Sequence, residues 1–214
     1  PAQGAGLHSY SAPNYGTLSA NFGATTYDWT AMPNTVSGAN NAVATLMYHC
    51  GVGVDMQYSP QVSGAWVISS HSPGTQNNAE FALRTYFGYD QSMQGIARDN
   101  YSEQQWINLL RTELDASRPI IYDGFGSGGG HCFVADGYDD NNFFHFNWGW
   151  GGQVNGYFAV GALNPGSTGT GGGSGGYNSG QEVIIGIKPA TGGGGGTGQL
   201  SNLELYNYVN VSAN

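Results

Sequence analysis

The stretch from Ile120 to Gly152 constrains the fold of this chain more than any other. Short apolar segments alternate there with glycine, aspartate and asparagine, a pattern typical of strands joined by tight turns. The predicted strands are 120–122, 131–136, 142–148, 157–160 and 182–187. Asp139-Asp140-Asn141 predicts a hairpin turn between the second and third of them. The second half of the chain is therefore expected to form an antiparallel sheet.

Helical patterns precede this sheet. Residues 1–30 indicate short strands or extended loops, and the expected helices cover 40–50, a segment starting near Gly64, 78–87 and 102–114, with an extended piece at 52–56. The last helix has the clearest start, because Ser102 is a good N-cap and Gln105 stands at the capping-box position. The order of elements predicts an α+β fold with two lobes, the helical part first and the antiparallel sheet part second.

Charge and composition exclude several classes of partner. The 214 residues carry five Lys+Arg against 14 Asp+Glu, a formal net charge of −9, so neither nucleic acid nor an anionic membrane surface is an expected partner. No apolar run is long enough for a membrane span. The two cysteines, Cys50 and Cys132, make no disulfide framework. A low-charge composition rich in glycine and tyrosine is typical of secreted bacterial proteins, and a first residue other than Met predicts a processed or excised fragment.

The glycine pattern predicts the domain limits. Residues 1–189 form the main domain, and 165–180 is a long glycine-rich loop inside it. Residues 190–198 form a glycine-rich linker. Residues 199–214 alternate like a strand and are too short to fold alone, so they predict a tail or the start of a following β-module.

One histidine has the surroundings of a catalytic base. Three glycines directly precede His131 at the start of a predicted strand, and Asn147 and Trp148 end the next predicted strand. Thiol peptidases need an imidazole, a group that orients its ring and a shield from water, which these three residues could provide. The alternatives are a buried histidine satisfied by a carbonyl group and a metal site formed with Asp136 and His145. Asp139 and Asp140 are interpreted as turn formers and not as a carboxylate pair for glycoside hydrolysis.

Neither cysteine suits the role of nucleophile. Cys132 directly follows His131 in a strand, so its side chain points to the opposite face. Cys50 is expected at a helix C-terminus, where the helix dipole raises the pKa of a thiol. Both cysteines are therefore interpreted as structural.

Several motifs resemble, in unbroken order over about 1–189, the streptopain family of papain-like cysteine peptidases. They include Val-Gly-Val-Asp-Met-Gln-Tyr-Ser-Pro (52–60), Gly-Gly-His-Cys-Phe-Val-Ala-Asp-Gly (129–137), Phe-His-Phe-Asn-Trp-Gly-Trp-Gly-Gly (144–152) and Ile-Gly-Ile-Lys-Pro (185–189). The resemblance implies a papain-like two-lobe fold and endopeptidase activity through a Cys–His dyad, with no metal and no cofactor. His131 matches the catalytic histidine, with Asn147 and Trp148 as the pair beside it. The implied substrate-binding residues are Ser63, Gly64, Phe125, Gly129, Gly130 and Trp150.

The chain departs from the family pattern at its start. The family's nucleophile lies in a Gly-Cys-Val-Ala-Thr-Ala-like segment that opens a helix ending in Tyr-His-x-x-Pro, and Pro1 resembles that final proline. The expected partners are therefore protein or peptide substrates, a preceding part of the same polypeptide that carries the cysteine, and an inhibitory pro-segment. The resemblance implies a secreted bacterial virulence factor made as a zymogen, and residues 1–214 alone are expected to be inactive. A catalytically inactive binding or adhesion module is the main alternative, and a transglutaminase-like or amidase activity is another.

Overall fold

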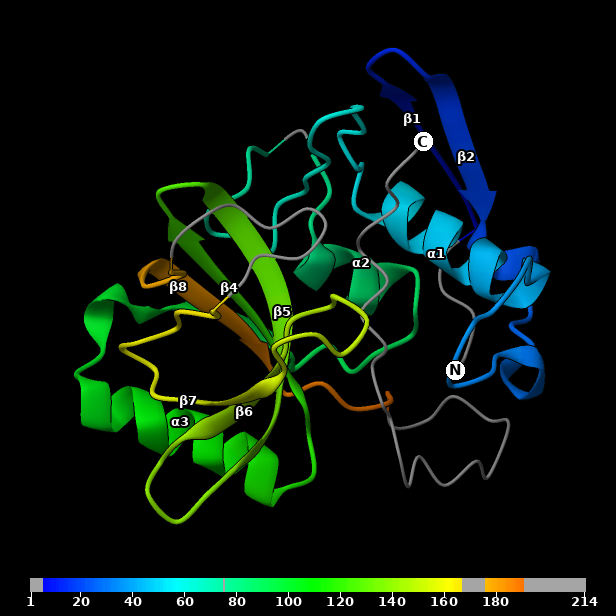
Figure 1. The fold of residues 1–214 in the computed structure, drawn as a ribbon. Coiled ribbons are helices and arrows are strands. Elements are labelled where there is room, and N and C mark those ends of the chain that lie inside the picture. Colours follow the sequence, from blue (N-terminus) through cyan, green and yellow to red (C-terminus); the bar gives the residue numbers. More distant parts are fainter. Residues whose placement is uncertain (1–5, 75, 167–175, 191–214) are drawn as a thin grey trace. The chain divides into compact units, whose positions relative to one another are not determined.

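The computed structural model describes residues 6–74, 76–166 and 176–190 (Figure 1). It divides into two compact units. Among the described residues, unit 1 comprises 6–74, 76–91 and 189–190, and unit 2 comprises 92–166 and 176–188. That residues 1–189 form one domain stays a prediction. The predicted tail 199–214 and all but the first residue of the predicted linker 190–198 lie outside the described residues.

Unit 1 begins with a β-hairpin and continues with helices. Its elements are β1 (Leu7–Ala12), β2 (Gly16–Asn21), the 3₁₀ turns η1 (Phe22–Ala24) and η2 (Trp29–Ala31), α1 (Asn41–Gly53) and α2 (Ala79–Thr85). The side chains of Asn40 and Asn78 cap the two α-helices by accepting hydrogen bonds from backbone N–H groups of the first turn. In the core of this unit, Phe22 stacks on Tyr86 with ring centroids 4.5 Å apart.

Two predictions for unit 1 are wrong. The helix expected near Gly64 is absent from the described residues, where Gly64 forms an isolated antiparallel bridge with Gln57. The extended piece expected at 52–56 is also wrong, because α1 runs on through Val52, which is fully buried. Gly51 lies inside this helix, and its missing side chain makes room for Tyr58, whose hydroxyl oxygen would lie 1.9 Å from an added Cβ atom.

Unit 2 is a six-stranded antiparallel sheet with one long helix. The strands are β3 (Gln94–Ala97), β4 (Ile120–Gly126), β5 (Gly129–Tyr138), β6 (Phe144–Asn147), β7 (Gly156–Phe158) and β8 (Ser179–Ile185); a 3₁₀ turn, η3 (Arg98–Asn100), and α3 (Glu103–Asp115) follow β3. The sheet order is β3-β8-β4-β5-β6-β7, so the last strand enters between two earlier ones. All five predicted strands are present with shifted limits, whereas β3 was not predicted.

Local sequence signals explain how unit 2 is built. Ser102 caps α3 and forms a full capping box with Gln105, as predicted. Asp139 closes the β5–β6 turn, since its carboxylate accepts 2.9 Å hydrogen bonds from two backbone N–H groups. Trp106 fixes α3 to the sheet by donating from its indole nitrogen to the Tyr122 hydroxyl over 2.8 Å.

The predicted order of helices first and strands second holds only in outline, because a hairpin precedes α1 and α3 belongs to unit 2. In the part of the chain that the structure describes, no helix is both long and apolar enough to cross a membrane.

Candidate active site

Glycines on β4 and β5 determine where His131 stands. In the β4–β5 ladder, His131 is paired with Gly124. The absence of a side chain at Gly124 lets the Tyr177 backbone approach, since its carbonyl oxygen would lie 2.5 Å from an added Cβ atom. Gly129 opens β5 with a φ of 116°, a left-handed conformation that favours glycine. The glycine run thus forms a tight turn that starts the strand carrying the imidazole.

One ring nitrogen of His131 makes a hydrogen bond, and the other is available. His131 Nε2 lies 2.7 Å from the backbone oxygen of Trp148. A carbonyl oxygen only accepts hydrogen bonds, so Nε2 carries the proton and Nδ1 of the neutral ring is the basic nitrogen. His131 Nδ1 has no hydrogen-bond partner among the described residues, and the residue is partly exposed. The hydrogen bond to a carbonyl group is the one expected for a structural histidine, whereas the open Nδ1 is what a general base needs.

An aromatic wall surrounds the ring. The His131 ring stacks on Trp150 with centroids 4.9 Å apart, and Tyr177 lies against it at 5.3 Å. Trp148 and Trp150 stack on each other at 5.8 Å. Burial lowers the pKa of His131, while the hydrogen bond to the Trp148 carbonyl group opposes that effect. The wall therefore favours the neutral imidazole, which is the form that acts as a base.

The carbonyl group of Trp148 was not anticipated as the partner of the ring. Asn147 was predicted for this role, and it lies at the end of β6 as expected, where its side-chain oxygen accepts from the Gly149 N–H over 3.2 Å. An orienting role for Asn147 stays a prediction. No sequence signal could have revealed the backbone contact, because every residue type has a carbonyl group.

The predicted substrate-binding residues fall in both units. Phe125, Gly129, Gly130 and Trp150 lie in unit 2 near His131, whereas Ser63 and Gly64 lie in unit 1. Phe125 is 46% exposed, so a large apolar side chain is available at the surface. Its ring covers Gly130, where an added Cβ atom would lie 2.6 Å from Cε1 of Phe125. Trp150 is buried and contributes to the wall behind the imidazole.

Both cysteines are free thiols, and Cys132 is placed as predicted on the opposite face from His131. Cys132, Asp123 and Glu182 pair across β5, β4 and β8, so their side chains share one face of the sheet. Burial, followed by the charges of Asp123 and Glu182, raises the pKa of the Cys132 thiol well above its usual value. Such a thiol is a poor nucleophile. The sequence did not predict that the buried acids Asp123 and Glu182 lie side by side, because only the register of β8 against β4 brings them together.

The histidine considered for a metal site has a simpler partner. His145 Nδ1 lies 2.5 Å from a carboxylate oxygen of Asp136. Among the residues that the structure describes, no three His, Cys, Asp or Glu side chains gather where they could hold a metal ion.

The candidate site is a strand-borne imidazole on an antiparallel sheet, fixed by a backbone carbonyl group, packed against Trp150 and Tyr177 and preceded by a glycine turn. The solved structures similar to this chain are cysteine proteases with a papain-like fold. Active interpain A cysteine protease of Prevotella intermedia matches with a TM-score of 0.73 and 38% identity, covering 86% of this chain and 75% of that chain. A prointerpain A fragment of the same organism matches with a TM-score of 0.70 and 37% identity, covering 88% and 59%.

The chain belongs to the Peptidase C10 family, whose model matches residues 1–158. Streptopain of Streptococcus pyogenes is 43% identical over 168 residues, which are 76% of this chain and 40% of streptopain. The thiol protease/hemagglutinin PrtT of Porphyromonas gingivalis is 40% identical over 199 residues, which are 89% of this chain and 22% of that protein. The chain therefore spans less than half the length of these curated relatives.

Proposed function

We propose that this chain is the histidine-bearing part of a secreted cysteine endopeptidase with a papain-like two-lobe fold, whose nucleophilic cysteine lies upstream of residue 1. The observation that carries the proposal is the His131 ring, fixed through Nε2 by the Trp148 carbonyl group and open at Nδ1. Relatives named streptopain and thiol protease support it. Neither Cys50 nor Cys132 has the surroundings of an activated thiol.

In this mechanism the upstream thiolate attacks the carbonyl carbon of a peptide bond. His131 Nδ1 first holds the proton taken from the thiol and then gives it to the leaving amine. A water molecule attacks the acyl-enzyme next, and Nδ1 accepts its proton. Throughout this cycle the Trp148 carbonyl group keeps the other proton on Nε2, and Trp150, which stacks on the ring, shields it from water. The Trp148 side chain would support this shield from behind, because it stacks on Trp150. Asn147, the last residue of β6, directly precedes Trp148 and is proposed to help orient the ring.

The remaining parts of the proposal concern substrate and regulation. The exposed Phe125 ring beside Gly130 would offer an apolar wall to a bound peptide, with Gly129 as a further contact. Ser63 and Gly64 of unit 1 stay predicted substrate-binding residues through the family resemblance alone. An inhibitory pro-segment is proposed because one structural relative is a prointerpain fragment. Secretion is proposed from the low charge content of 9% and the high glycine content.

The test uses the longer polypeptide that contains both the upstream cysteine and residues 1–214. Its cleavage of casein should be abolished by His131→Ala, with kcat/KM falling on the order of 10³-fold or more because the general base is lost. His145→Ala is the matched control, since it removes an imidazole that contacts Asp136 instead, and its activity should persist. Retained proteolysis in the His131→Ala variant refutes the assignment, as does proteolysis by residues 1–214 alone.

An inactive binding or adhesion module is the second candidate, favoured by the lack of an activated thiol in this chain and by the hemagglutinin name of one relative. A peptidyl epoxysuccinate labels only an activated cysteine. Covalent labelling of the longer polypeptide supports the peptidase, whereas agglutination or peptide binding without labelling supports the module.

A further inference from the structure

We propose that Gln181, on β8, is a positioning residue for His131, acting through the backbone and ring of Tyr177. The inference rests on the proposed peptidase function for its kinetic consequences. Its geometry lies wholly within the described part of unit 2.

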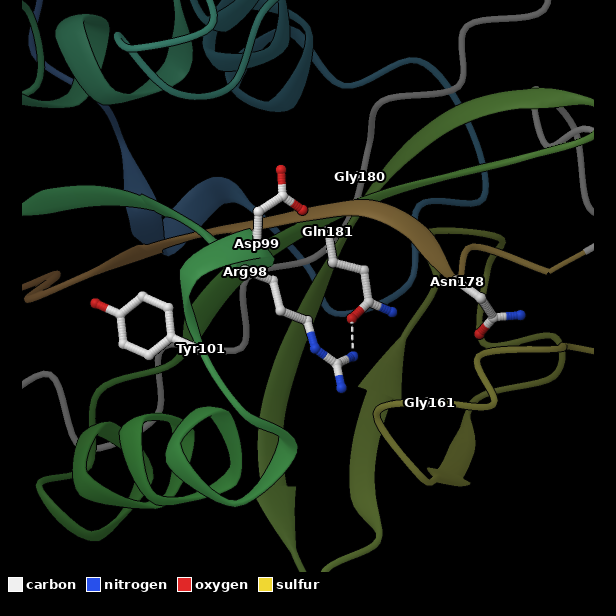
Figure 2. A pocket seen from close by; sticks show the side chains of 7 residues that line it. All are labelled: Arg98, Asp99, Tyr101, Gly161, Asn178, Gly180 and Gln181. Carbon is white, nitrogen blue, oxygen red and sulfur yellow. Dashed lines mark hydrogen bonds between the residues drawn. The ribbon is translucent and has the colours of Figure 1, made fainter.

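The Gln181 carboxamide is the centre of a buried polar network. The residue is 2% exposed, and all four of its hydrogen-bonding positions are filled by protein groups. Its oxygen accepts from the Tyr122 hydroxyl over 2.8 Å and from Arg98 Nη1, the contact drawn as a dashed line in Figure 2. Its Nε2 donates to the backbone oxygens of Val160, over 2.9 Å, and of Tyr177, over 3.0 Å.

Figure 2 shows Arg98 extending from η3 to the Gln181 carboxamide, at a surface cavity of about 310 Å³. Arg98 Nη1 also donates to the Val160 carbonyl oxygen over 2.7 Å. Arg98 and Gln181 thus hold the same carbonyl group from two directions. The orientation of this amide is unambiguous, because the oxygen faces an arginine and the nitrogen faces two carbonyl groups.

The contact with Tyr177 connects this network to the candidate active site. Tyr177 follows directly after the glycine-rich stretch and is 1% exposed. Its N–H donates to the Leu163 carbonyl group over 2.9 Å, and its carbonyl group accepts from Gln181, so its peptide groups are held on both sides. The Tyr177 ring then packs on His131 at 5.3 Å and on Trp148 at 5.7 Å.

Tyr177 is therefore the element through which Gln181 acts. The carbonyl group that Gln181 holds is the same one that lies against Gly124, the residue paired with His131 in the sheet. If that carbonyl group moved, the Tyr177 ring would shift against the imidazole. A displacement of about 1 Å at a reacting group can cost about 100-fold in rate, so the network bears on catalysis although Gln181 does not touch the ring.

The experiment measures steady-state kinetics of the longer polypeptide with Gln181→Met, an apolar variant of similar size. We expect kcat to fall about 10- to 100-fold with KM changed less than about threefold, because positioning of the base is lost while peptide binding remains. Tyr122→Phe is the matched control. It removes one bond to the same carboxamide and the acceptor of Trp106, but it leaves the bond from Gln181 to Tyr177, so kcat should stay within about twofold.

A double-mutant cycle tests the route. If Gln181 acts through Tyr177, then Gln181→Met combined with Tyr177→Leu should be no slower than the slower single variant. If the losses of kcat in the two single variants multiply in the double variant, the proposal is wrong. It is also wrong if Tyr122→Phe loses kcat in proportion to a fall in its unfolding midpoint. If Gln181→Met fails to fold, Gln181→Glu is the second variant. It keeps an oxygen for Arg98 and Tyr122 but puts a carboxylate oxygen, which cannot donate, opposite the Val160 and Tyr177 carbonyl groups. An unchanged kcat in this variant also refutes the proposal.

A readout without turnover separates this inference from the proposed function. Titration of the His131 ring by ¹⁵N NMR should show its lowered pKa moving toward the ordinary value in Gln181→Met and staying in place in Tyr122→Phe, because the ring wall loosens only in the first. If wild-type protein cleaves nothing, the peptidase proposal fails while this comparison still decides the coupling. An unchanged His131 pKa in Gln181→Met refutes the coupling even in an active enzyme.

Discussion

The acids buried beside Cys132 make the stability of unit 2 depend on pH in an unusual direction. Asp123 is 6% exposed and faces Glu182 across the β4–β8 ladder. Burial, and secondarily the charge of Glu182, raises the pKa of Asp123 from 3.8 to about 8. The folded protein therefore binds a proton at Asp123 that the unfolded chain releases at a much lower pH.

The sign and size follow from proton linkage. Because the pKa of Asp123 is higher in the folded state, its stabilising contribution is complete below about pH 4 and is lost as the pH rises to about 8. The free energy of unfolding should fall by up to about 1.4 kcal/mol per pH unit in this window, a total of a few kcal/mol. Asp123→Asn removes the titrating carboxyl group and should flatten this decline.

Urea unfolding between pH 5 and 8.5, followed by tryptophan fluorescence, measures the effect. Trp106, Trp148 and Trp150 are buried in unit 2, so their emission reports on the unit that contains Asp123. Asp140→Asn is the control, since it removes an acid from the exposed β5–β6 turn and should keep the wild-type slope. A wild-type decline that is equally steep in Asp123→Asn would refute the linkage.

Two further changes test local stability. Ser102→Ala breaks the capping box with Gln105 and should destabilise α3 by about 1 kcal/mol, seen as a lower unfolding midpoint with an unchanged dependence on urea; an unchanged midpoint would mean that the cap contributes nothing. Arg118→Met leaves the buried Glu113 carboxylate with the N–H of Gly186 as its one hydrogen-bond donor among the described residues, and with the charge of Lys188, so it should cost roughly 3 kcal/mol at pH 7. Because Arg118 holds the pKa of Glu113 below its usual value, that cost should shrink as the pH falls below about 4, and a cost independent of pH would contradict this.

Local patterns predicted the parts of the fold that depend on neighbouring residues. The Ser102 cap, the Asp139 turn and the strands around His131 are all encoded within a few positions, so sequence reasoning found them. The helix predicted near Gly64 is wrong for the opposite reason. Its backbone hydrogen bonds are made with Gln57 across a loop, and helical propensity says nothing about such a partner.

The amino-acid order alone predicted His131 as the candidate base, since a glycine run before His131 and an Asn-Trp pair at the end of the next strand are local signals. Tertiary structure decided the rest. It chose the Trp148 carbonyl group as the partner of the ring, brought Gln181 to Tyr177, and aligned Asp123 with Glu182. The physical reason is that backbone carbonyl groups are common to all residues and that strand register is set by the whole sheet, so contacts between distant segments leave no mark in the local sequence.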